Sequence, residues 1–109
     1  MAPAWQGTGE TGGRTDMTGR EGSDDEVFRE RTRRDRLFGL WAARQLGLDG
    51  GNALVYAAEV TEADAEGGEG RMVAKVVADL EREEASVDPA TVERRLRDCE
   101  NQARQRPPG

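Results

Sequence analysis

The sequence contains no histidine and only one cysteine, Cys99, among its 109 residues. Without a second cysteine the chain forms no intrachain disulfide, which is typical of a protein in a reducing compartment, so we expect it in the cytoplasm. These shortages also remove the ligands of a His/Cys zinc site and the imidazole of acid–base catalysis. We therefore expect no metal and no cofactor, and an enzyme is the least favoured class of function. We interpret Cys99 as a small buried apolar residue.

Aromatic residues are also few, at 5% of the chain, and no apolar run approaches the roughly 20 residues of a membrane span. The N-terminus has no apolar core of a secretion signal. With 35% charged and 35% hydrophobic residues, a chain of this length predicts one small domain with a thin core. The net charge of −6 lies mostly in the C-terminal half. The lack of a long apolar run disfavours membrane insertion, and the negative charge disfavours nucleic-acid binding.

Residues 1–23 contain six glycines and four threonines without apolar periodicity, which predicts a disordered tail. Ser23 and the acidic residues after it offer a capping hydroxyl and negative charge to a helix N-terminus. We therefore expect a long first helix over about 24–48, opening a domain over 24–106.

The two halves of this first helix differ in kind. Charged side chains point in all directions over residues 29–36, so that half is expected to be solvated. Apolar residues cover about half the circumference over residues 37–48, so that half is expected to be enclosed by other helices, with Trp41 at the centre of the core.

Three further helices are predicted over about 53–65, 71–84 and 89–105. The sequence EGGEG separates the first two, and Asp88 with Pro89 marks the start of the last. Short loops between four helices indicate an all-α fold, a small four-helix bundle. The expected core consists of Leu37, Phe38, Trp41, Leu48, Tyr56, Val60, Val76, Leu80 and Leu96.

The arginine-rich half of the first helix has two interpretations. The charges can simply keep an exposed helix soluble. Alternatively, this half is an arm that docks on an acidic or polar cleft of a partner, with Phe28 as its apolar anchor.

Three stretches carry a resemblance to a known family: RRDRLFGLWAARQLGL (33–48), DGGNALVYAAEV (49–60) and EADAEGG (62–68). Over about residues 24–105 the chain resembles the ATPase inhibitor zeta subunit family of alphaproteobacteria. The resemblance implies a small, four-helical, cytoplasmic regulator of the F-type ATP synthase. Its partners would be the catalytic subunits, where an inserted helix blocks rotation and so prevents ATP hydrolysis. The chain is expected to be a monomer when free.

The sequence departs from this family at its N-terminus, where the family carries a charged, helix-prone inhibitory segment. Here Gly- and Thr-rich sequence takes that place, and each glycine costs a helix about 1 kcal/mol relative to alanine. Residues 7–22 are therefore not expected to form a helix. Two hypotheses stay open: a regulator of the ATPase, and a stand-alone helical interaction module with another partner. The candidate partner-binding residues are Asp24, Asp25, Glu26, Phe28, Arg29, Arg33 and Arg34.

Overall fold

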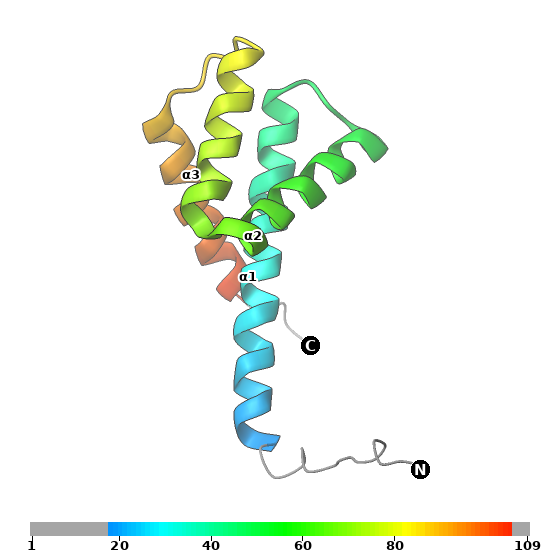
Figure 1. Ribbon diagram of the computed structural model, residues 1–109, viewed down its shortest axis with the longest axis vertical. Coiled ribbons are helices and arrows are strands. Elements are labelled where there is room, and N and C mark those ends of the chain that lie inside the picture. The colour runs from blue at the N-terminus through cyan, green and yellow to red at the C-terminus, as the bar shows by residue number, and fades with distance from the viewer. Residues whose placement is uncertain (1–17, 106–109) are drawn as a thin grey trace, which may run out of the picture.

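The computed structural model describes the chain from Thr18 to Gln105, and its side chains from Asp25 onward. This part consists of three helices, α1 (Thr18–Gln45), α2 (Gly50–Arg82) and α3 (Pro89–Arg104), and contains no strand. In Figure 1, α1 follows the long axis of the molecule, and the C-terminal segment of α2 rises beside its upper half. All three helices touch one another, but α1 packs against α2 and α3 much more extensively than these two pack against each other, so it is the central helix of the fold.

The prediction of a four-helix bundle is wrong, because the helices expected over 53–65 and 71–84 are both parts of α2. Within EGGEG only Gly68 leaves the helical region, with φ 85° and ψ −177°. Glycine adopts a positive φ at little cost, so helical turns continue directly on both sides of this residue. One residue thus kinks α2 sharply, where the sequence suggested a loop between two helices (Figure 1).

The bounds of α1 also differ from the prediction. The helix begins at Thr18, earlier than the expected residue 24, so Ser23 lies inside it and does not cap it. The expected disordered tail over residues 1–23 lies outside the described residues for 1–17, while its last part is helical. The helix ends at Gln45, three residues before the expected 48.

The helix ends are set by hydrogen bonds of the backbone. After α1, Gly47 takes a φ of 81°, and the N–H groups of Gly47 and Leu48 donate to the carbonyls of Arg44 (3.0 Å) and Ala43 (2.9 Å). This is the Schellman arrangement, which satisfies the last carbonyls of a helix. At the start of α3, the Asp88 side chain accepts the N–H of Thr91 at 2.8 Å, as expected of a cap before Pro89.

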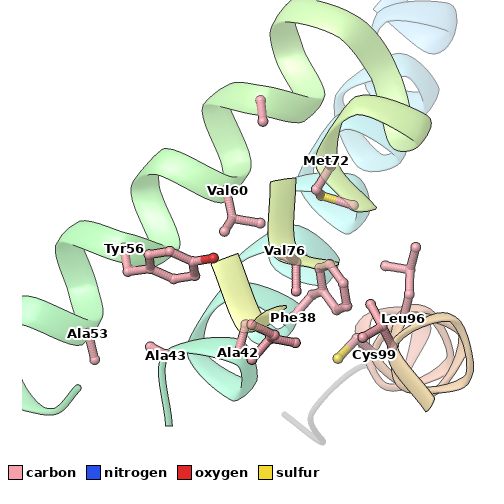
Figure 2. Packing of buried hydrophobic residues seen from close by; sticks show 13 residues of the cluster. Phe38, Ala42, Ala43, Ala53, Tyr56, Val60, Met72, Val76, Leu96 and Cys99 are labelled. Carbon is pink, nitrogen blue, oxygen red and sulfur yellow. The ribbon is translucent and has the colours of Figure 1, made fainter. Parts of the chain in front are cut away.

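The core lies between the C-terminal half of α1, both segments of α2 and one face of α3 (Figure 2). Six of the nine predicted core residues are buried: Phe38, Tyr56, Val60, Val76, Leu80 and Leu96. The other three, Leu37, Trp41 and Leu48, are only partly buried and pack against the edge of the cluster. Trp41 is therefore not the centre of the core. Phe38, which has no exposed surface and lies about parallel to Trp41 with ring centroids 6.0 Å apart, takes that place.

Candidate functional site

The N-terminal end of α1, residues 18–30, extends beyond α2 and α3, and we call it the α1 arm (Figure 1). Two large apolar side chains of the arm face solvent: Val27 is 64% exposed and Phe28 is 69% exposed. Burial of such a side chain in an interface favours binding, by roughly 1.5–3 kcal/mol for each side chain that is fully buried. The arm is thus a helix with apolar residues available for contact.

The predicted partner-binding residues do not form one surface. Asp25, Phe28, Arg29 and Arg33 are exposed, and Glu26 is half-buried. Asp24 lies in α1, but its side chain is outside the described residues. Although it is exposed, Arg33 also donates from Nη1 to the carbonyl oxygen of Ala103, which ties α1 to the end of α3.

The prediction that Arg34 binds a partner is not supported, because only 8% of this residue is exposed. Its neighbour Asp35 is also buried, so residues 29–36 are not the fully solvated segment that the charge pattern suggested. The reason is a carboxylate on the facing helix: Asp64 of α2 is 3% exposed and accepts Arg34 at 3.3 Å. Arg34 is therefore part of the fold and is not available to a partner.

Asp64 is the acceptor at the centre of this buried charge cluster. Arg31 donates two parallel hydrogen bonds to Asp64, from Nε to Oδ2 at 2.7 Å and from Nη2 to Oδ1 at 2.8 Å. Paired bonds of this kind between a guanidinium and a carboxylate are stronger and more directional than single neutral ones. The arginine hydrogen bonds hold the pKa of Asp64 down to about 2, against the opposing effect of burial. Arg31 thereby fixes the root of the α1 arm to the middle of α2.

The cluster extends to α3 through Arg34. Its guanidinium lies 3.3 Å from Glu69, the residue after the α2 kink, and 3.6 Å from Glu100 of α3. Arg97 of α3 pairs with both of these glutamates. We call this set of seven residues the junction cluster: Arg31, Arg34, Asp35, Asp64, Glu69, Arg97 and Glu100. It joins all three helices where the arm leaves the body.

A second buried carboxylate, Asp79, lies near the far end of α2. The hydroxyl of Tyr56 donates to it at 2.7 Å, and Lys75 and Arg82 donate at 3.0 and 2.6 Å. Burial raises the pKa of Asp79, but these three hydrogen bonds outweigh it and hold the pKa below its usual value. Burial beside Asp79 raises the pKa of the Tyr56 phenol. These contacts hold the two segments of α2 together.

Sequence reasoning missed the two buried carboxyl groups of α2, Asp64 and Asp79, although a signal was present. Asp64 follows Tyr56 and Val60 at intervals of four residues, and Asp79 follows Val76 by three residues. Residues at these spacings share one face of a helix. An acidic residue on an apolar face has to be paired, so each of these positions indicates a buried partner.

The described part of the chain offers little for other chemistry. No three of its cysteine and acidic residues are grouped so as to hold a metal ion. Cys99 is a buried free thiol whose pKa is raised by burial, which makes it unreactive. None of the described helices combines the length and the apolar character needed to cross a membrane.

Comparison with known proteins gives one match. The family model described as ATPase inhibitor subunit zeta matches residues 21–106, which covers the part of the arm from residue 21 on, the junction cluster and the whole core. Searches of curated proteins and of solved structures found no match to the chain. Because the matched segment is most of the sequence, the chain belongs to the ATPase inhibitor subunit zeta family.

Proposed function

We propose that this protein binds the catalytic head of the F-type ATP synthase through its α1 arm and restrains ATP hydrolysis. Membership of a family of ATPase inhibitor subunits supports a regulatory role on this enzyme. The observation that carries the proposal is the exposed apolar pair Val27 and Phe28 on a helix that projects from the body. The site of action would be the cytoplasm.

The arm has the chemistry of a helix that inserts between two surfaces. Phe28 provides an aromatic anchor, and Arg29 beside it provides positive charge. Arg33, which lies one turn beyond the arm, is also exposed. Aromatic and arginine side chains supply most of the binding free energy in many protein interfaces. Asp25, which is exposed, and its neighbours Asp24 and Glu26 add negative charge to the same part of α1.

The body of the protein would hold the arm in one direction. A flexible arm loses conformational entropy when it docks, whereas a helix already fixed at its root loses less. The Arg31–Asp64 pair, buried on the Asp64 side, provides this fixation. Arrest of the enzyme would follow if the arm binds one catalytic interface more tightly than the alternative states of that interface.

The test is the ATP hydrolysis rate of the isolated catalytic head, measured with increasing amounts of the full chain. We expect the hydrolysis rate to fall as the protein is added and to level off once every catalytic head has bound it. The double substitution Val27→Ala and Phe28→Ala should weaken inhibition about 100- to 20,000-fold, since each side chain is worth roughly 1.5–3 kcal/mol on burial and about 1.4 kcal/mol corresponds to a factor of ten. The matched control changes Leu54 and Val55, which are equally exposed but lie on the body, and should inhibit like the unchanged protein.

An unchanged hydrolysis rate at a large excess of protein would refute inhibition. Capture of partners from a cell lysate then separates the remaining possibilities, because a non-inhibitory ATPase ligand still recovers catalytic subunits. A stand-alone interaction module would recover other proteins.

A further inference from the structure

The most unusual feature outside the proposed docking surface is a pair of buried carboxyl groups in the junction cluster. Asp35 of α1 is 2% exposed and Asp64 of α2 is 3% exposed. One guanidinium nitrogen of Arg34, Nη2, contacts both carboxyls, at 2.9 and 3.3 Å. The two carboxyls therefore lie close to each other inside the fold. Two negative charges in one buried site repel each other, which favours a proton on one of the two carboxyls.

The charges around the pair lead to the same conclusion. The junction cluster contains three guanidinium groups, those of Arg31 and Arg34 on α1 and of Arg97 on α3. It contains four carboxyl groups: Asp35 on α1, Asp64 and Glu69 on α2, and Glu100 on α3. If all four were ionised, the cluster would carry one net negative charge, and two of its four carboxylates, those of Asp35 and Asp64, would be buried. One bound proton makes the cluster neutral.

We propose that the Asp35–Asp64 pair holds a single proton, carried by Asp35, and that release of this proton weakens the junction of α1, α2 and α3. Asp64 keeps its negative charge because Arg31 binds it with two hydrogen bonds. Among the described residues, Asp35 forms an ion pair with Arg34, and this guanidinium also pairs with Asp64, Glu69 and Glu100. The thiol of Cys99 on α3 is also close enough to Arg34 to be influenced by its positive charge.

The pH range of this switch follows from the surroundings of Asp35. Burial and the neighbouring Asp64 carboxyl raise the pKa of Asp35 to about 7, although Arg34 opposes the shift. Histidine is the usual side chain that titrates between pH 5 and 8, and the sequence contains none. Asp35 would therefore take the part that a histidine plays in other pH-sensitive proteins.

Solvent can reach the cluster. A hollow of about 410 Å³ opens beside the root of the arm, and the lining includes Arg31, Arg34, Glu69 and Glu100. Water in this hollow would carry the proton away from the buried pair. The hollow also gives room for the side chains of the junction cluster to move apart once the pair is doubly charged.

The sign of the effect on stability is opposite to that of most carboxyl groups. Below pH 7 the folded chain holds a proton on Asp35 that the unfolded chain has released above pH 4, so stability falls as the pH rises through this range. The unfolding equilibrium constant should rise on the order of 50-fold between pH 5 and 7, and level off above pH 7.

The experiment is urea unfolding of the full chain at pH 5, 6, 7 and 8. Asp35→Asn keeps the shape of the protonated carboxyl, so this variant should show no such rise between pH 5 and 7. Asp98→Asn, on the exposed face of α3, is the matched control and should keep the rise of the unchanged protein. A rise that persists in Asp35→Asn would overturn the proposal, as would its absence in the unchanged protein.

A second measurement does not depend on whether Asp35→Asn folds. Carbon NMR of the aspartate carboxyl groups in the unchanged protein should show one group, Asp35, that titrates with a midpoint near pH 7. A midpoint below pH 5 for Asp35 would overturn the proposal. Neither experiment involves the ATPase, so the outcome is independent of the proposed function.

Discussion

The crossing of α1 and α2 depends on the absence of a side chain at Gly39. A Cβ atom placed at Gly39 would lie 2.7 Å from the Cα of Ala57 and 3.2 Å from the Cβ of Val60, below ordinary van der Waals contact. Because the nearest atom belongs to the backbone, the helices themselves would have to move apart. The substitution Gly39→Ala is therefore predicted to destabilise the protein.

The magnitude combines two opposing effects. Overpacking of a core costs about 1–3 kcal/mol, while alanine gains about 1 kcal/mol over glycine in a helix. We expect a net loss of up to about 2 kcal/mol, and each kcal/mol corresponds to roughly 4–8 °C in Tm for a domain of this size. Thermal unfolding followed by circular dichroism measures it.

The matched control is Gly70→Ala in α2, where a new Cβ meets no atom within 4 Å. There only the helix propensity changes, so Tm should rise, by an amount equivalent to at most about 1 kcal/mol. If Gly39→Ala raises Tm as Gly70→Ala does, the close crossing of α1 and α2 is not as described.

Further predictions concern the core, the second buried carboxylate and the end of α2. Phe38→Ala should lower the free energy of unfolding by about 3–5 kcal/mol, and Trp41→Ala by clearly less because Trp41 is only partly buried; equal losses in urea unfolding would contradict this order. Tyr56→Phe removes a hydrogen bond to the charged Asp79 and should cost about 1.5–3 kcal/mol. A depressed carboxyl pKa gives stability that is lost as the pH falls, so the higher Asp79 pKa in Tyr56→Phe should move acid unfolding to higher pH; an unshifted acid midpoint would argue against the Tyr56–Asp79 bond. Glu84 has a φ of 57°, so Glu84→Gly should stabilise by about 1 kcal/mol, and a lower Tm would contradict this.

Helix type and most of the core could be predicted because they depend on local spacing. The buried residues Val60, Val76 and Leu96 follow the helical period that the sequence displays. Asp88 was identifiable as a cap because its neighbours Pro89 and Thr91 complete a local motif.

The kink at Gly68 was harder to predict, because three closely spaced glycines look alike in sequence. Only the packing of the two α2 segments against α1 determines which glycine leaves the helical region. Gly67 and Gly70 keep helical backbone angles, so the chain continues as helix on both sides of Gly68 without a loop.

The burial of Arg34 depends on contacts distant in sequence. Its partners Asp64 and Glu100 are 30 and 66 residues away, so no local pattern around Arg34 reveals them. Arg33 and Arg34 are adjacent and have similar sequence neighbours, yet Arg33 is exposed and Arg34 is buried. The candidate docking site therefore loses Arg34 and rests on the exposed residues of the arm.

The central claim is that the exposed end of α1 touches the catalytic head of the ATP synthase. A photocrosslinking amino acid in place of Phe28 tests it most directly, with the same group in place of Leu54 on the body as reference. We predict that position 28 crosslinks to catalytic subunits of the isolated head and that position 54 does not. Equal crosslinking from both positions, or none from position 28, would contradict the claim.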